Sequence, residues 1–165
     1  MLHKFVQYAV TGRFSRFKLK RQKFDLPDNL QNIGLYFHIP FCQHSCPYCP
    51  YNKCPYEENK ASVYVNAIIK EINLYKSKLV NTNISSVYIG GGTPTLLLKG
   101  IRDIIKQIKK NFMLNGSIGI EAHPENLSSQ NLSFLSNIEV DMLSIGIQSF
   151  NDRLLKILGR TMILN

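Results

Sequence analysis

The sequence predicts an α/β protein built around a parallel sheet, and three observations lead to this prediction. From Gly34 onward, short apolar runs alternate with longer amphipathic segments, a pattern typical of parallel β/α units. Each apolar run ends in a turn that carries polar or glycine residues. The length of 165 residues suffices for one sizeable hydrophobic core, so we expect one domain over residues 34–165.

Four strands and four helices are expected in strict alternation. The short apolar runs place strands at Leu35–Ile39, Val87–Ile89, Ser117–Glu121 and Met142–Gly146. The longer segments with helical periodicity place helices at Glu57–Leu79, Leu98–Phe112, about Ser128–Ser136, and Asn151–Leu158. The apolar face of the first helix is expected to carry Val63, Ala67, Ile68, Ile72 and Tyr75.

Residues 1–33 are predicted to form a basic extension that precedes the domain. Part of the net charge of +9 gathers there, because seven lysines and arginines come before the first acid, Asp25. Such an arm could meet nucleic acid, an anionic membrane or an acidic substrate, and it also resembles an organelle transit peptide. No nucleic-acid-binding motif accompanies the charge, so we expect a solvated extension and no nucleic acid partner.

The apolar runs are too short for a membrane span, which needs about twenty apolar residues. The start of the chain also lacks the apolar core of a secretory signal. Both features predict a cytoplasmic protein without a transmembrane segment.

Three cysteines in the loop after the first strand carry the strongest chemical signal. Cys42, Cys46 and Cys49 have the spacing C-x-x-x-C-x-x-C, and soft thiolates at such spacing suit an iron–sulfur cluster. Three ligands would leave one iron open for a small molecule. The alternatives are a structural zinc site completed by His44 or Cys54, and a disulfide framework, which the absence of a signal sequence disfavours. Cys54 is expected to be an ordinary thiol.

The ends of the other predicted strands carry further candidate residues. Parallel strands gather their carboxyl ends at one edge of a sheet, so Gly90–Pro94, Glu121–Pro124 and Gln148–Asn151 should meet the cysteine loop. A glycine run lets backbone groups approach a ligand closely, although a plain tight turn remains an alternative. It lacks the lysine of a phosphate-binding loop. Read singly, Glu121 could be solvated, and Arg160 could cap its helix.

Together these residues resemble the radical S-adenosylmethionine superfamily. Leu35–Cys42, Gly90–Thr95 and Ile145–Asn151 are similar to its branch of oxygen-independent coproporphyrinogen III oxidases and haem chaperones, in the same order from about Gly34 to Thr161. The resemblance implies a partial TIM barrel of about six β/α units. This chain supplies about four, so we expect the amino-terminal portion of such a barrel.

The resemblance implies two cofactors. Cys42, Cys46 and Cys49 would bind a 4Fe-4S cluster, with Tyr48 shielding it, and S-adenosylmethionine would bind the open iron. The positions that match cofactor-binding residues of the family are Tyr36, Gly91, Gly92, Thr93, Glu121, Gln148 and Arg160.

The implied activity is reductive cleavage of S-adenosylmethionine to a 5′-deoxyadenosyl radical, with electrons from a reduced flavodoxin or ferredoxin. In the oxidases the radical removes hydrogen from a propionate side chain of the tetrapyrrole, which then loses carbon dioxide. Tyr51 stands where these oxidases carry a further cysteine, and this departure favours the alternative of a haem-binding chaperone. A third expectation is that the short chain alone is inactive.

Overall fold

The computed structural model describes residue 26 and residues 30–160, and it confirms the parallel α/β architecture. Four strands form one sheet in the order β1-β4-β5-β6, and every neighbouring pair is parallel. Their bounds are β1 Asn32–Ile39, β4 Asn83–Gly91, β5 Met113–Ala122 and β6 Met142–Ile145. A second, two-stranded parallel pair is formed by β2 (Phe41–Cys42) and β3 (Cys54–Pro55).

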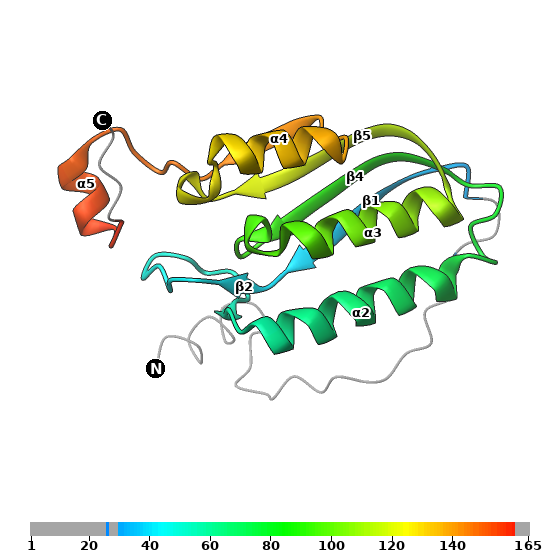
Figure 1. Cartoon of the computed structure of the whole chain (residues 1–165), viewed down its shortest axis with the longest axis horizontal. Coiled ribbons are helices and arrows are strands. Elements are labelled where there is room, and N and C mark those ends of the chain that lie inside the picture. The colour runs from blue at the N-terminus through cyan, green and yellow to red at the C-terminus, as the bar shows by residue number, and fades with distance from the viewer. Residues whose placement is uncertain (1–25, 27–29, 161–165) are drawn as a thin grey trace, which may run out of the picture.

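The helices follow the strands in the predicted order (Figure 1). Their bounds are α2 Glu58–Tyr75, α3 Leu98–Asn111, α4 Ser129–Asn137 and α5 Asp152–Ile157. Two short 3₁₀ helices, η1 (Pro94–Leu97) and η2 (Pro124–Asn126), occupy the turns after β4 and β5. None of the helices within the described part of the chain is long and apolar enough to cross a membrane.

Several element ends differ from the predicted ones. Strands β4 and β5 both begin four residues earlier than expected, at Asn83 and Met113. Their first residues include polar side chains, which hide a strand from an apolar pattern, yet the backbone of these residues pairs with the neighbouring strand. Helix α2 ends at Tyr75, four residues before the predicted end at Leu79. Leu79 is buried although it lies outside the helix, so it extended the apolar pattern from which the helix was predicted.

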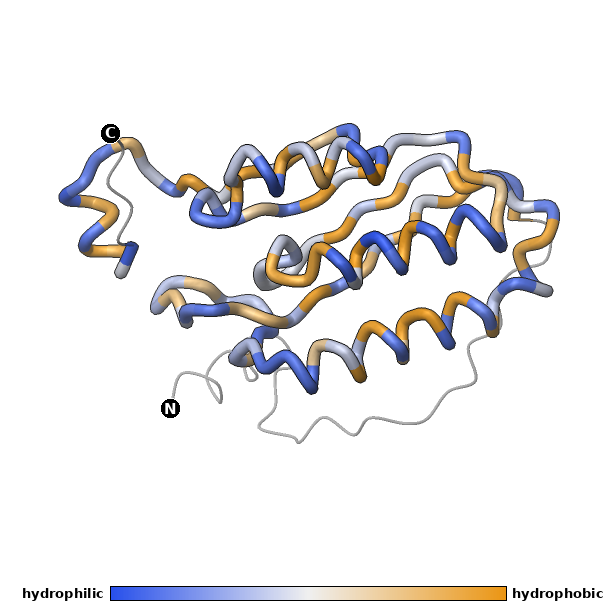
Figure 2. The backbone as a smooth tube through the Cα atoms, viewed as in Figure 1, coloured by the Kyte–Doolittle hydropathy of each residue, from blue (hydrophilic) through white to orange (hydrophobic). Residues whose placement is uncertain are grey.

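The hydrophobic core lies between the sheet and its helices. Alternate residues of the central strands are buried, including Val87, Ile89 and Ile120, and they meet the buried isoleucines of α3 such as Ile104. The hydrophobic and hydrophilic residues alternate along α2 and α3 (Figure 2), as expected for helices with one buried face. The opposite face of the sheet carries polar, glycine and exposed aromatic residues.

The predicted apolar face of α2 was right for Ile68, Ile72 and Tyr75, which are buried or pack against the core, and wrong for its other two residues. Val63 is 70% exposed and Ala67 is exposed, whereas the buried residues are Ala61, Val65, Ile68 and Ile72. The buried residues are spaced by four, three and four positions, which keeps them on one side of a helix with 3.6 residues per turn. Val63 lies five positions before Ile68 and therefore points well away from that side.

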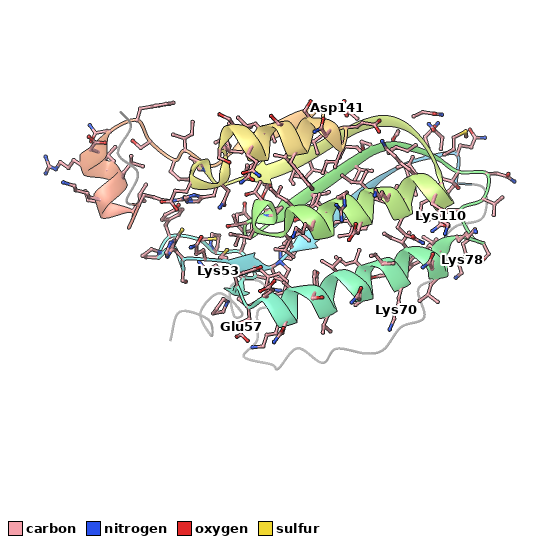
Figure 3. All side chains as sticks on the ribbon, in the orientation of Figure 1. Lys53, Glu57, Lys70, Lys78, Lys110 and Asp141 are labelled. Atoms are coloured by element: carbon pink, nitrogen blue, oxygen red, sulfur yellow. The ribbon has the colours of Figure 1, made fainter. Side chains whose placement is uncertain are left out.

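The start of β6 is fixed by a reciprocal contact with β5. The carboxylate of Asp141, a residue labelled in Figure 3, accepts a hydrogen bond from the Ile118 backbone N–H at 2.7 Å. The Asp141 N–H donates to the Ile118 carbonyl at 2.9 Å. The pairing of Gly119 with Met142 follows directly. This contact sets the register that brings the end of β6 beside the end of β5.

The predicted extension, residues 1–33, lies almost wholly outside the described residues and stays a prediction. Strand β1 begins at Asn32, three residues before the predicted strand. The Asn83 side chain donates a hydrogen bond to the Asn32 side-chain oxygen at 2.7 Å. The sheet therefore begins within the last residues of the predicted extension.

We expect Ile120→Ala to lower the free energy of unfolding by about 3 kcal/mol, because Ile120 is fully buried in β5 and its loss would leave a cavity. Urea unfolding followed by circular dichroism measures this change. The matched control is Val63→Ala, which should change stability by less than about 0.5 kcal/mol at an exposed position. Equal losses in the two variants would contradict the assignment of the core.

Candidate cofactor site

A cavity of about 410 Å³ lies at the carboxyl edge of the sheet, where the four predicted loops meet. Figure 1 shows the cysteine loop and α5 at this same end of the molecule. Nine of the ten sequence-predicted site residues line the cavity: Cys42, Cys46, Cys49, Gly91, Gly92, Thr93, Glu121, Gln148 and Arg160. Tyr36 is the exception among them.

The cysteine loop is closed at its base by backbone hydrogen bonds. The Cys54 N–H donates to the Pro40 carbonyl at 2.8 Å, and the Tyr56 N–H donates to the Cys42 carbonyl at 2.9 Å. Within the loop, the Lys53 ammonium donates to the carbonyls of Cys46 (2.8 Å) and Cys49 (3.2 Å). These contacts hold both ends of the loop and tie its tip to its return strand.

The glycine turn, residues 90–93, packs against the start of the cysteine loop. The Gly92 N–H donates to the Ile39 carbonyl and the Thr93 N–H to the Phe41 carbonyl, both at 2.7 Å. A Cβ atom at Gly92 would lie 2.5 Å from the Phe41 carbonyl oxygen and 2.8 Å from the Cys42 Sγ, so only glycine fits. Gly91 has a φ of 119°, a conformation that side chains disfavour.

The thiol of Cys42 lies beside Gly92 in this contact. Burial raises the pKa of Cys42, and hydrogen bonding to Thr93 partly opposes that rise. All four cysteines are half-buried free thiols, so no disulfide framework exists among them. In residue 26 and residues 30–160, no three His, Cys, Asp or Glu side chains are positioned together to hold a metal ion.

Glu121 is held at the mouth of the glycine turn. Its carboxylate accepts hydrogen bonds from the Gly91 N–H at 2.9 Å and from the Tyr88 hydroxyl at 3.3 Å. The Tyr88 ring in turn stacks on Tyr36 with centroids 6.3 Å apart. Glu121 therefore belongs to a network that fixes the glycine backbone.

Tyr36 reaches the site through a neighbour rather than directly. Its side chain lies on the open face of the sheet, 58% exposed, with the hydroxyl 3.0 Å from His38 Nδ1. The other ring nitrogen of His38 lies 3.0 Å from the Asn52 carbonyl on the cysteine loop. His38 thereby connects Tyr36 to the loop, and burial raises the pKa of the Tyr36 hydroxyl.

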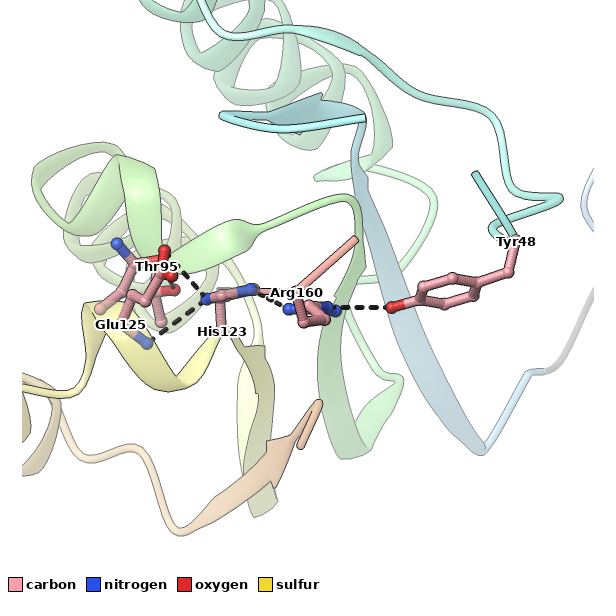
Figure 4. Close-up of polar contacts among 6 residues, drawn as sticks. Tyr48, Thr95, His123, Glu125 and Arg160 are labelled. Atoms are coloured by element: carbon pink, nitrogen blue, oxygen red, sulfur yellow. Dashed lines mark hydrogen bonds and ion pairs between the residues drawn. The ribbon is translucent and has the colours of Figure 1, made fainter. Parts of the chain in front are cut away.

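Arg160 and Tyr48 join the segment after α5 to the cysteine loop across the cavity. The Arg160 Nε donates to the Tyr48 hydroxyl at 3.0 Å, although the residues are 112 positions apart, and the Arg160 Nη1 contacts His123 Nε2 (Figure 4). The burial of Tyr48 raises the pKa of its hydroxyl, which the hydrogen bond from Arg160 opposes. Burial and the nearby Arg160 charge lower the pKa of His123.

Gln148 sits in a tight backbone turn just beyond β6. Its φ of 70° is unusual for a residue with a side chain, and a Cβ atom at Gly146 would lie 3.1 Å from its Nε2. The absence of a side chain at Gly146 thus leaves room for the Gln148 amide at the cavity wall.

The sequence did not single out His38, Lys53 or Tyr88, because none of them belongs to a repeated spacing. His38 and Tyr88 act through contacts between distant segments, whereas Lys53 acts within the cysteine loop. His123 stands in the predicted strand-end segment Glu121–Pro124, but its contact with Arg160 was not foreseen. For the zinc alternative, His44 lines the cavity, whereas Cys54 packs against the core and not on the cavity.

The donor set of the cavity suits an iron–sulfur cluster and an amino-acid ligand. Three cysteines of one loop line the cavity and their thiols are soft ligands, and the glycine turn leaves a cradle that a Cβ atom would fill. A carboxylate (Glu121) and a guanidinium (Arg160) on other walls complement ammonium and carboxylate groups.

Residues 36–163 match the family model described as the Radical SAM superfamily. The heme chaperone HemW of Bacillus subtilis (strain 168) is 37% identical over 129 residues, covering 76% of this chain and 34% of the relative. The oxygen-independent coproporphyrinogen III oxidase of Escherichia coli (strain K12) is 33% identical over 132 residues, covering 78% of this chain and 29% of the relative.

The solved structure of coproporphyrinogen III oxidase (HemN) from Escherichia coli, described as a radical SAM enzyme, has the same fold. It superposes with a TM-score of 0.76 and 31% identity, over 81% of this chain and 32% of that chain. The chain thus spans about a third of the length of the relatives it matches. These matches confirm the resemblance that the motifs predicted.

We expect Glu121→Ala to speed hydrogen exchange of the Gly91 amide by about tenfold, because that N–H loses its carboxylate acceptor. Exchange followed by nuclear magnetic resonance measures the rate. The matched control is Glu71→Ala on the exposed side of α2, which should leave the Gly91 rate unchanged. Unchanged exchange in Glu121→Ala would show that the carboxylate does not hold the glycine turn.

Proposed function

Since the chain belongs to the radical SAM superfamily, we propose that it binds a 4Fe-4S cluster through Cys42, Cys46 and Cys49 and S-adenosylmethionine beside that cluster. The observation that carries this proposal is the single cavity in which the cysteine loop, the glycine turn, Glu121 and Arg160 meet. The lining combines soft ligands for iron with charges of both signs for an amino acid.

The chain's own residues would divide the work of binding. The backbone at Gly91–Thr93 would approach the methionine end of the cofactor, and the Glu121 carboxylate would meet its ammonium group. Arg160 would meet the carboxylate, and the Gln148 amide would contact the cofactor from the wall after β6. Tyr36 would support the cysteine loop through His38 and Asn52.

When bound, the cluster supplies the electron that cleaves the sulfonium of S-adenosylmethionine. The protein orients the cofactor and excludes water from the half-enclosed cavity. We place this chemistry in the cytoplasm, with a reduced flavodoxin or ferredoxin as the electron donor.

The substrate we propose is a tetrapyrrole, because the chain is similar to a coproporphyrinogen III oxidase over its matched residues. In an oxidase of this type, the 5′-deoxyadenosyl radical would take a hydrogen atom from a propionate side chain, and loss of carbon dioxide together with one electron, passed to an external electron acceptor, would leave a vinyl group.

Anaerobic reconstitution tests the cluster. We expect about four irons per chain in the wild type and loss of most of the bound iron in Cys42→Ser, Cys46→Ser or Cys49→Ser. Iron and sulfide analysis with visible absorbance measures the loading. The matched control is Cys54→Ser, which should keep the wild-type iron content because Cys54 faces the core.

The electron paramagnetic resonance spectrum of the reduced cluster should shift when S-adenosylmethionine is added. Wild-type loading in all three cysteine variants would refute the ligand assignment. A cluster whose spectrum does not change on addition of S-adenosylmethionine would refute cofactor binding by this chain. It would support the alternative that the short chain alone is inactive.

A second candidate function, a haem-binding chaperone, is favoured by Tyr51. This tyrosine stands where the oxidases of the family carry a further cysteine, and the similar proteins include the heme chaperone HemW of Bacillus subtilis and Lactococcus lactis. A chaperone would use the same fold to carry haem without transforming it.

Haem titration and product analysis separate the two functions. If the chaperone function holds, haem should bind stoichiometrically with a shifted Soret band, and coproporphyrinogen III should release no carbon dioxide. If the oxidase function holds, the reduced, cofactor-loaded protein should release carbon dioxide from coproporphyrinogen III. Release of carbon dioxide by the wild type would rule out a pure chaperone.

A further inference from the structure

His123 is a polar residue of the cavity that neither the motifs nor the proposed binding roles explain. It follows the last residue of β5, its side chain is only 18% exposed, and it lies between Arg160 and the 3₁₀ helix η2. Figure 4 shows the ring between the guanidinium and the residues at the start of η2. The ring can therefore form a hydrogen bond with Arg160 or with the start of η2.

The two ring nitrogens of His123 face different partners. Nε2 contacts Arg160 Nη1, whereas Nδ1 lies 3.3 Å from the Glu125 backbone N–H and 3.6 Å from the Glu125 carboxylate. A neutral imidazole has only one unprotonated nitrogen, so it can accept a hydrogen bond from Arg160 or from the Glu125 N–H, but not from both.

Arg160 decides which nitrogen is the acceptor. A guanidinium has donors only, so a protonated Nε2 would direct its N–H against those donors. The hydrogen bond from a charged donor is also stronger than the one from the Glu125 N–H. The proton therefore belongs on Nδ1, where the Glu125 carboxylate faces it.

Two side chains then fix the Arg160 guanidinium. His123 accepts from Nη1 and Tyr48 accepts from Nε, so Nη2 is the nitrogen left to meet an anion. Nη2 lies 4.0 Å from the position of a Cβ at Gly146, on the wall of the cavity. The backbone of Arg160 is held as well, since its N–H donates to the Leu155 carbonyl at 2.8 Å.

We propose that His123 is a positioning residue: as the Nδ1–H tautomer it holds the Arg160 guanidinium so that Nη2 points at the carboxylate of the bound ligand. This inference rests on the proposed binding of S-adenosylmethionine. The charged and titratable groups around the ring are Arg160, Glu125 and His44, and burial together with the Arg160 charge lowers the pKa of His123, which favours the neutral ring.

Two substitutions distinguish the two alternative acceptor roles of the ring, toward Arg160 and toward the Glu125 N–H. His123→Gln places an amide oxygen near the position of Nε2 and keeps an acceptor for Arg160. His123→Asn places its oxygen near Nδ1, where it can accept from the Glu125 N–H and cap η2, but it loses the contact with Arg160. A purely structural role at the start of η2 would make Asn the better replacement.

Calorimetric titration of the reconstituted chain with S-adenosylmethionine provides the binding readout. We expect the dissociation constant to rise about tenfold in His123→Asn and to stay within about threefold of wild type in His123→Gln. Equal weakening in both variants, or a larger effect of Gln, would overturn the inference.

The tautomer gives a second readout that needs no cofactor. Nitrogen-15 chemical shifts of the His123 ring in the cofactor-free chain should show the proton on Nδ1, and Arg160→Ala should remove that preference. A proton on Nε2 in the wild type would overturn the inference. If the wild type fails to bind S-adenosylmethionine, the proposed function fails, and the tautomer still decides whether His123 orients Arg160.

Discussion

The candidate site depends on the backbone seam between the glycine turn and the cysteine loop. Two hydrogen bonds of 2.7 Å, from Gly92 to Ile39 and from Thr93 to Phe41, bring the end of β4 against the first cysteine. The seam is possible only because Gly92 has no Cβ atom to strike Phe41 and Cys42. Each wall of the cavity is placed relative to this contact, including Glu121, which holds the Gly91 N–H.

The order of the elements could be predicted because it rests on local patterns. Apolar runs and helical periodicity gave all four strands of the main sheet and all four α-helices among the described residues. The strand starts were missed where polar residues such as Asn83 pair through backbone groups, which no side-chain pattern reports. Two of the five residues predicted for the buried face of α2 were also wrong, because Val63 and Ala67 are apolar but exposed.

The residues of the site could be predicted from the sequence, but the contacts among them could not. The cysteines and glycines stand close together in the sequence, so their spacing is visible, and nine predicted residues line one cavity. The contacts that organise them were not visible. His123 and Tyr48 meet Arg160 only after four β/α units have folded, and Tyr36 acts through His38, which depends on the return path of the cysteine loop.

The closure of the cysteine loop has a consequence for synthesis on the ribosome. Every backbone contact that shapes it comes from Ile39 to Thr93: Pro40 with Cys54, Cys42 with Tyr56, and the seam with Gly92 and Thr93. A nascent chain can therefore complete this loop before β5 has emerged, since amino-terminal units fold first. The backbone of the loop would then be in place before Arg160, which lines the cavity from a later part of the sequence, has been translated.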